Sequence, residues 1–259
     1  MIGSVGFMNN LFSPLAIITI LAAPFIGSFL GLLVDRLPLG RPVLLGRSAC
    51  ENCGHTLGPL DLVPFASWTI LKGRCRYCRY KIGHFYPLIE LAAVVVALWS
   101  ALVVPADLLL FTVALGWALL CLALIDARHM YLPDVLTLPL LLLGLILASS
   151  YDIFDPVSHG IGALLGAVAF ALVRWVYFLL RGIEGLGLGD VKLFAAAGAW
   201  LGWQGLPSVL LIAGVTGLIF ALIKQRGRQT SSTKRSIAFG PFLATGVWIT
   251  WLYGPLTLF

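Results

Sequence analysis

The chain has 259 residues, of which 60% are hydrophobic and 11% charged, and its mean hydropathy is +0.99. A soluble domain carries about a quarter charged residues, so this composition excludes a soluble enzyme and predicts an all-α polytopic membrane protein. The formal net charge of +6 is attributed to basic loops beside membrane spans and to anionic lipid headgroups, and not to nucleic-acid binding.

Eight apolar segments are candidates for membrane-spanning helices, because a helix needs about 20 residues to cross the hydrocarbon core. They cover residues 14–34, 87–104, 107–126, 134–150, 157–180, 190–205, 207–223 and 237–258. The segments 134–150 and 190–205 are short for this task, and a short span thins the bilayer or borders a water-filled cavity. The first ten residues lack the basic n-region of a cleavable signal peptide, so we expect the first span to be retained.

The basic residues give the predicted orientation. With eight spans threaded in order, all 17 lysines and arginines fall on one side of the membrane, and the other side keeps only acidic and polar residues. The positive-inside rule places the basic side in the cytoplasm and both termini outside. We therefore expect a first span within residues 1–34, a cytoplasmic loop over 35–86 and a membrane core over 87–259.

The loop contains two C-x2-C pairs, formed by Cys50, Cys53, Cys75 and Cys78. Two such knuckles offer four thiolates for a tetrahedral Zn²⁺ site. A segment this small cannot bury a hydrophobic core alone, so it needs a bound metal or a disulfide to be stable. Disulfides are disfavoured in the cytoplasm. We predict a structural, zinc-ribbon-like site, with reduced or redox-active thiols as the alternative. His55 is interpreted as incidental, and Cys121 as a packing residue of the third span.

Two acids lie at span ends. Asp126 closes the third apolar segment, and Asp190 follows the run G-L-G-L-G at the start of the sixth. The orientation inferred from basic residues places both at the cytoplasmic side. Two carboxylates brought close share a proton, and such a pair hydrolyses peptide bonds by taking a proton from water and giving one to the substrate. The glycines at 185, 187 and 189 would let the backbone approach a bound peptide.

Other interpretations of these acids stay open at this point. An aspartate at a helix start can cap the helix and complement its dipole, and Asp126 has Arg128 and Lys192 as candidate ion-pair partners. Paired intramembrane acids also serve proton-coupled transport, which is the alternative function, although we find neither midplane acids nor repeat symmetry. A zinc-stapled membrane scaffold would leave both acids dispensable.

Several other acids are assigned structural roles. Glu90, early in the second span, is expected to pack or pair with a basic residue. Asp134 is expected to start the fourth helix, with Pro133 fixing the preceding turn. Asp35 and Arg36 are expected to anchor the end of the first span.

Motifs along nearly the whole chain resemble those of the type IV prepilin peptidases. They are G-S-F-L at 27–30, D-R-L-P at 35–38, the four-cysteine loop, Y-P-L-I-E at 86–90, Asp126 running to L-P-D at 132–134, G-L-G-D-V-K-L at 187–193 and F-G-P-F at 239–242. Signal-peptide-peptidase or presenilin-like enzymes share an aspartate pair and GxGD, but the cysteine loop is not expected in them.

The resemblance implies an aspartyl endopeptidase of the bacterial inner membrane, with Asp126 and Asp190 as the catalytic pair. Such enzymes cut the basic leader from prepilin or pseudopilin precursors at the cytoplasmic face. The resemblance also implies N-methylation of the new N-terminus with S-adenosylmethionine. No strand followed by G-x-G-x-x-G occurs, so no residue is assigned to that cofactor. Because the cytoplasmic face is basic, we expect the pilin helix to enter laterally, with local acids near its leader, namely Asp35, Glu51, Asp61 or Glu184.

Overall fold

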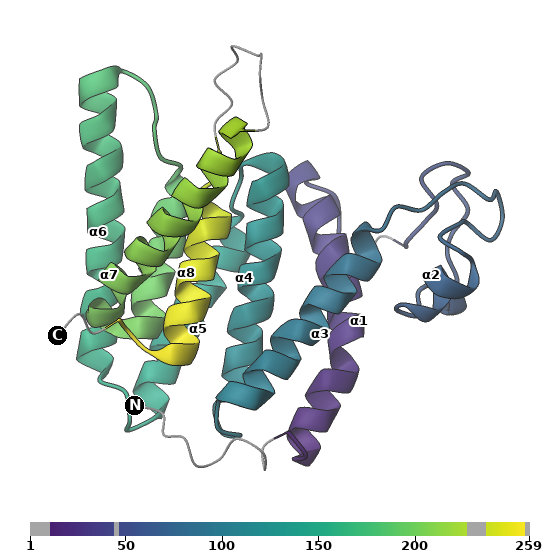
Figure 1. Cartoon of the computed structure of the whole chain (residues 1–259), viewed down its shortest axis with the longest axis horizontal. Coiled ribbons are helices and arrows are strands. Elements are labelled where there is room, and N and C mark those ends of the chain that lie inside the picture. Colours follow the sequence, from purple (N-terminus) through teal and green to yellow (C-terminus); the bar gives the residue numbers. More distant parts are fainter. Residues whose placement is uncertain (1–10, 44–46, 227–236, 257–259) are drawn as a thin grey trace. The chain divides into compact units, whose positions relative to one another are not determined.

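A computed structural model describes residues 11–43, 47–226 and 237–256. Within these residues every regular element is a helix, and β-type pairing is limited to two isolated bridges in the cysteine loop (Figure 1). The prediction of an all-α chain is therefore confirmed. The elements are α1 (Pro14–Arg36), η1 (Leu37–Leu39), η2 (Pro59–Asp61), α2 (Ala66–Ile70), α3 (Phe85–Val103), α4 (Leu109–His129), α5 (Asp134–Ser150), α6 (Pro156–Arg181), α7 (Leu188–Arg226) and α8 (Gly240–Tyr253).

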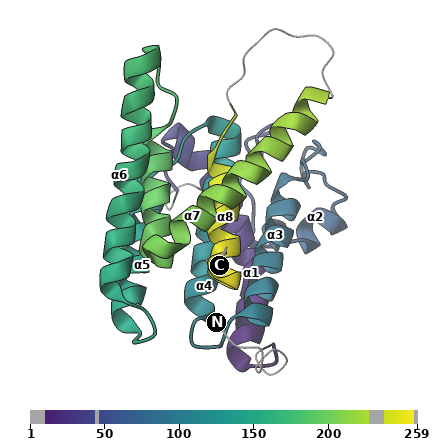
Figure 2. The ribbon, with the colours of Figure 1, turned by 60° about the vertical axis from the view of Figure 1, so that its left-hand side comes forward.

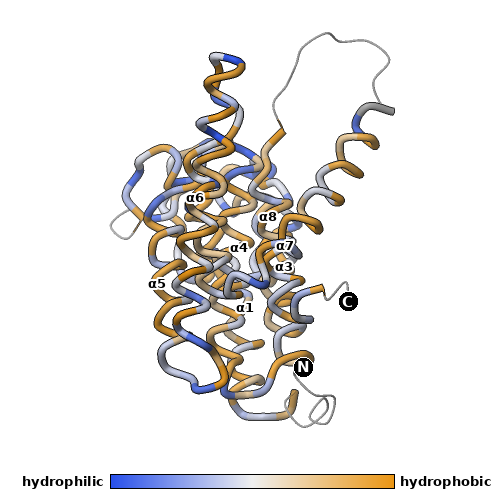
Figure 3. Tube along the Cα trace, turned by 90° about the vertical axis from the view of Figure 1, so that its left-hand side faces the viewer, coloured by the Kyte–Doolittle hydropathy of each residue, from blue (hydrophilic) through white to orange (hydrophobic). Residues whose placement is uncertain are grey.

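Among the described residues, five helices are long and apolar enough to cross a membrane, and α5 is a shorter apolar helix. The five are Pro14–Leu39, Phe85–Val103, Leu109–His129, Pro156–Arg181 and Leu188–Lys224. Figure 3 shows hydrophobic residues along the helices and hydrophilic ones gathered in the connecting segments. A multi-pass membrane protein follows from these helices, whereas the count of eight crossings stays a prediction. The predicted outward location of the two chain ends concerns residues outside the described ones.

The chain divides into two compact units, which end and begin within α4 at Cys121 and Leu122. In the first unit, α1 packs closely on α3. A Cβ atom at Gly27 would lie 2.6 Å from the Cα atom of Glu90, so the two helix backbones nearly touch. The Tyr86 hydroxyl donates to Asp35 at 2.8 Å, which joins the end of α1 to the start of α3 and agrees with the anchoring role predicted for Asp35.

The second unit is built around α7, which packs against α5, α6 and α8 (Figures 1 and 2). Helix α6 begins where Asp155 accepts hydrogen bonds from the first turn and Pro156 fixes the first helical position. Its backbone then approaches α7 through glycines: a Cβ at Gly166 would meet the carbonyl oxygen of Phe194 at 2.5 Å, and one at Gly162 would meet that of Gly198 at 2.6 Å. The order of these contacts makes α6 antiparallel to the first part of α7.

Helix α7 is interrupted at Gly202, whose φ of 68° and ψ of 174° are not helical. Only glycine adopts this backbone region readily. Beyond it, Val209 contacts Gly246 and Gly217 contacts Phe242, so the second part of α7 runs antiparallel to α8. The first part of α7 runs parallel to α8, because both helices begin near Asp126 and Trp200 packs on Trp251 toward their other ends. The chain therefore reverses at Gly202, close to the boundary predicted between 190–205 and 207–223.

Candidate active site and metal centre

The two predicted acids lie in the same unit, at helix ends from different parts of the chain. Asp126 is in the last turn of α4 and is only 6% exposed. Its Oδ2 atom accepts a hydrogen bond of 2.8 Å from the backbone N–H of Gly240, the first residue of α8. The first N–H groups of a helix have no partner within it, so Asp126 satisfies one of them and is held in orientation by it.

Asp190 is in the first turn of α7 and is half-buried. It lies close enough to Asp126 for the charge of that residue to act on it, and the backbone N–H of Gly187 also interacts with its carboxylate. Its Oδ1 atom is buried and has no hydrogen-bond partner among the described residues. The two predicted residues therefore lie within electrostatic reach of each other, and one carboxylate oxygen of Asp190 has no hydrogen-bond partner among the described residues.

Glycines allow the close packing around this pair. A Cβ atom at Gly240 would lie 2.6 Å from Oδ2 of Asp126, and one at Gly189 would lie 2.6 Å from Cβ of Leu132. The sequence suggested that the glycines of the G-L-G-L-G run admit a bound peptide. In the structure, Gly189 lets the start of α7 pack directly on Leu132, and the approach of a peptide to this run stays a prediction.

The ion pairs near the site are also defined. Lys192 is bound to Asp134 at 2.5 Å, so this lysine neutralises Asp134 and not Asp126. Asp134 is the first residue of α5 and follows Pro133, as predicted. The pair ties the first turn of α5 to the second turn of α7, two residues beyond Asp190.

The four loop cysteines converge, with all Sγ atoms within 4.8 Å of one another. The Sγ atoms of Cys50 and Cys78 are 3.7 Å apart, too far for a disulfide of about 2.0 Å. A regular tetrahedron with Zn–S bonds of about 2.3 Å places its sulfurs about 3.8 Å apart, so the spacing suits a metal. His55 instead stacks on Tyr77, with ring centroids 3.6 Å apart.

Each cysteine pair is folded as a tight knuckle with the same backbone pattern. The N–H of Cys50 donates to the carbonyl of His55 and that of Cys75 to the carbonyl of Tyr80, both at 2.9 Å. Backbone N–H groups also face the sulfurs: that of Cys53 lowers the pKa of Cys50, and that of Tyr80 lowers the pKa of Cys78. Such N–H donors stabilise thiolates, the form in which sulfur binds metal.

The knuckles are joined by Asp61, whose carboxylate is 7% exposed and binds Arg76 at 2.7 Å. Burial disfavours the charged form of Asp61, but the hydrogen bonds from Arg76 and from the N–H of Gly58 outweigh it and lower the pKa of Asp61. Glu90 is 5% exposed and accepts the backbone N–H of Phe65 at 2.9 Å. It thus holds the loop on α3, which supports its structural interpretation.

Three of the four acids that we considered for recognition of a basic leader already have partners, whereas Glu51 is exposed. Asp35 accepts the Tyr86 hydroxyl, Asp61 binds Arg76, and Glu184 binds Arg174 at 2.6 Å. Of these, Glu184 is the most accessible, with 65% of its side chain exposed.

Two contacts beside the acid pair were not expected from sequence. The donor to Asp126 is the backbone N–H of Gly240; the F-G-P-F motif at 239–242 contains this residue, but the motif alone did not point to Asp126. Arg174 was interpreted only as part of the positive charge bias, but it lies inside α6 and binds the segment before α7. An arginine flanked by apolar residues within a predicted span is the signal that points to such a role.

Comparison with known proteins agrees with the resemblance noted in the sequence. The model of the type IV leader peptidase family matches residues 113–222, and that of the bacterial peptidase A24 N-terminal domain matches residues 21–104. No solved structure matches the chain.

Several curated relatives are named prepilin leader peptidase/N-methyltransferase. That of Burkholderia pseudomallei strain 1026b is 44% identical over 222 residues, which cover 85% of this chain and 71% of the relative. The relative from Pseudomonas aeruginosa PAO1 is 38% identical over 276 residues, and the match covers 93% of this chain and 92% of the relative. The relative from Dickeya chrysanthemi is 41% identical over 251 residues, and the match covers 85% of this chain and 86% of the relative.

Proposed function

The chain belongs to the type IV leader peptidase family, and we propose that it is an aspartyl endopeptidase acting on prepilin or pseudopilin precursors. It would remove their basic leader at the cytoplasmic face of a bacterial inner membrane. The observation that carries this proposal is the convergence of Asp126 and Asp190 from the ends of α4 and α7. The family match also disfavours the proton-coupled transporter considered from sequence.

In the proposed reaction the two carboxylates share one proton. The ionised group takes a proton from a water molecule, which attacks the carbonyl carbon of the scissile peptide bond. The protonated group donates to the carbonyl oxygen, which gives a tetrahedral diol. When the C–N bond breaks, the proton taken from water passes to the leaving amine, and the diol returns a proton to the other carboxylate, which restores the pair. Asp126 is oriented by the N–H of Gly240, whereas the unpartnered Oδ1 atom of Asp190 is available to the water or the substrate carbonyl.

Asparagine substitutions test this assignment, because they keep the size and one acceptor oxygen of the side chain but abolish proton exchange. We expect Asp126→Asn and Asp190→Asn each to slow cleavage of a purified prepilin by about 10²- to 10⁴-fold, the usual contribution of acid–base catalysis. Asp152→Asn is the matched control, since Asp152 is exposed on the loop between α5 and α6. A correctly inserted Asp126 or Asp190 variant that cleaves at the parental rate would refute the proposal.

Zinc is the metal that the four cysteines fit, and its proposed role is structural. Cys50, Cys53, Cys75 and Cys78 would supply all four ligands, so no position is left for a substrate or a water. When bound, the metal would hold the two knuckles together, since this loop has few buried apolar residues of its own.

N-methylation with S-adenosylmethionine is a second candidate activity, supported by the names of the relatives. The described residues contain no strand–turn–helix arrangement of the kind that binds nucleotides in Rossmann folds, so no residues are assigned to the cofactor. Transfer of a labelled methyl group to the N-terminus of a processed pilin tests it directly, and absence of transfer by an active peptidase would dismiss it.

The proposed topology has eight crossings, with the cysteine loop in the cytoplasm and both termini outside. It divides the chain into a first span at 1–34, the zinc loop at 35–86 and the peptidase core at 87–259. Single cysteines placed at positions 72 and 152 in a cysteine-free variant should be labelled by a membrane-impermeant maleimide from opposite sides. Labelling from the same side would exclude this topology.

A further inference from the structure

Arg174 is the feature of the described second unit that the proposed chemistry leaves unexplained. It lies seven residues before the end of α6, a helix long and apolar enough to span a membrane. A guanidinium in such a helix is costly unless it is paired. Its side chain is 21% exposed and makes two directed interactions with the loop that connects α6 to α7.

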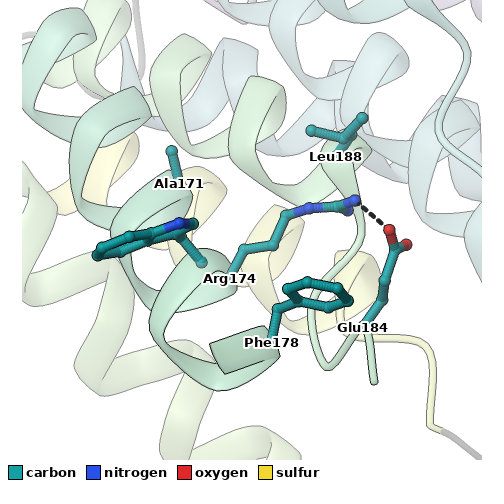
Figure 4. A pocket seen from close by; sticks show the side chains of 6 residues that line it. Ala171, Arg174, Phe178, Glu184 and Leu188 are labelled. Atoms are coloured by element: carbon teal, nitrogen blue, oxygen red, sulfur yellow. Dashed lines mark hydrogen bonds and ion pairs between the residues drawn. The ribbon is translucent and has the colours of Figure 1, made fainter. Parts of the chain in front are cut away.

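Both interactions hold the segment that leads to the acid pair. Nη1 donates to the carbonyl of Leu186 at 3.0 Å. Nη2 donates to Glu184 at 2.6 Å, the interaction drawn as a dashed line in Figure 4. The carbonyl of Leu186 precedes α7, so no helix bond is formed there, and an unpaired carbonyl at membrane depth would be unfavourable. The planar, forked guanidinium of arginine serves two acceptors at once with a fixed geometry, which an ammonium lacks.

Neighbouring side chains of α6 continue the same contact. The ring of Tyr177 lies directly on the backbone of Gly185, where any Cβ atom would overlap it. Leu188, the first residue of α7, lies with Ala171 and Phe178 around an open, mostly apolar groove beside Arg174 (Figure 4). The loop is therefore held along α6 from residue 184 to residue 188.

We propose that Arg174 is a positioning residue for Asp190. By fixing the carbonyl of Leu186 and the side chain of Glu184, it sets where α7 begins along α6. Asp190 lies four residues beyond that carbonyl, in the first turn of α7, so a shift of the loop moves its carboxylate relative to Asp126. This inference rests on the proposed peptidase function and adds a residue that does not touch the substrate.

The test compares Arg174→Met with the parent protein, purified in detergent. Methionine keeps much of the apolar stem and removes both donors. We expect kcat for prepilin cleavage to fall about 10- to 100-fold, because a displacement of about 1 Å can cost about 10²-fold, with KM changed less than about twofold. Arg174→Lys should recover part of kcat, since an ammonium retains the charge but serves the two acceptors less well.

Two controls separate positioning from general stability. Arg181→Met removes an exposed arginine of the same helix and should leave kcat unchanged. Hydrogen–deuterium exchange of Arg174→Met should accelerate over residues 182–190, which join α6 to α7, and remain parental within α6. Parental kcat in Arg174→Met, a loss confined to KM, an equal loss in Arg181→Met, or faster exchange throughout the protein would each overturn the proposal.

The aspartate variants distinguish a failure of the positioning role of Arg174 from a failure of the proposed peptidase function. If Asp126→Asn and Asp190→Asn are inactive and Arg174→Met is fully active, only the positioning role is wrong. If the aspartate variants cleave normally, the peptidase assignment itself is wrong, and the exchange measurement alone then reports whether Arg174 orders the loop.

Discussion

Replacing Gly240 by alanine tests the geometry of the acid pair without removing either acid. The added Cβ would lie 2.6 Å from Oδ2 and 3.0 Å from Cγ of Asp126, and real side chains essentially never approach this closely. The carboxylate must move away, which breaks its hydrogen bond of 2.8 Å to the Gly240 N–H.

The size of the effect follows from that one bond. A hydrogen bond to a charged group contributes about 1.5–3 kcal/mol, and each 1.36 kcal/mol corresponds to a factor of ten in rate. We therefore expect Gly240→Ala to lower kcat for prepilin cleavage by about 10- to 100-fold. Cleavage is followed by electrophoretic separation of precursor and mature pilin over a range of substrate concentrations.

Gly214→Ala is the control, since a Cβ at that position in α7 meets nothing within 4 Å; it should cleave at the parental rate. A double-mutant cycle identifies the cause: Asp126→Ala removes the obstructing carboxylate, so Gly240→Ala should lower the Tm less in that background than in the parent. A parental kcat for Gly240→Ala, or equal Tm shifts in both backgrounds, would refute the reasoning.

Three further predictions concern the loop and the helix packing. Purified protein should contain about one zinc per chain by mass spectrometry of its metals, and the Cys50→Ser, Cys75→Ser double variant should contain none; a metal-free parent would contradict the site. Asp61→Asn should destabilise the loop by about 0.2–1 kcal/mol. The folded-state pKa of Asp61 is lowered, so its contribution to stability is fully present above the unfolded value of about 3.9 and is lost only as the pH falls through the lower folded value. The proteolysis rates of the parent and of Asp61→Asn should therefore differ equally at pH 5 and pH 8. A difference that vanishes at pH 5 would contradict this prediction. Gly198→Ala should destabilise the protein by more than about 2 kcal/mol, because its Cβ would overlap the backbone of α6. Gly160→Ala is the control, since its Cβ would meet nothing within 4 Å, and it should leave stability unchanged. Equal melting temperatures for the two variants would argue against close packing of α6 on α7.

Local sequence signals predicted the parts of this protein that depend on local physics. Apolar runs located the helices, because burial in lipid or protein requires long apolar segments. The C-x2-C spacing predicted that the four sulfurs converge, since each knuckle fixes two of them over a few residues. Pro133 before Asp134 correctly placed the start of α5.

The unpredicted features depend on contacts between distant segments. Lys192 was a candidate partner for Asp126 because both lie near span ends, yet it binds Asp134; the choice depends on how α5 packs beside α7. The sequence predicted a boundary between 190–205 and 207–223, and the reversal of α7 falls close to it, at Gly202, but no local pattern singled out this glycine. Glycine takes the left-handed backbone that the turn requires, and proline is tolerated near the first turn of the helix that follows.

The hydrogen bond between Gly240 and Asp126 links folding to the proposed chemistry. The start of α8 has unpaired N–H groups, and in an apolar setting each needs an acceptor; Asp126 supplies one and is oriented in return. An asparagine at position 126 keeps a carbonyl oxygen for this donor, whereas an alanine leaves it unpaired. Asp126→Asn should therefore lose cleavage while keeping a near-parental Tm, and Asp126→Ala should lose both. If the two variants melted alike, well below the parent, the carboxylate charge itself would stabilise this helix junction, and the loss of cleavage in Asp126→Asn would no longer isolate its catalytic role.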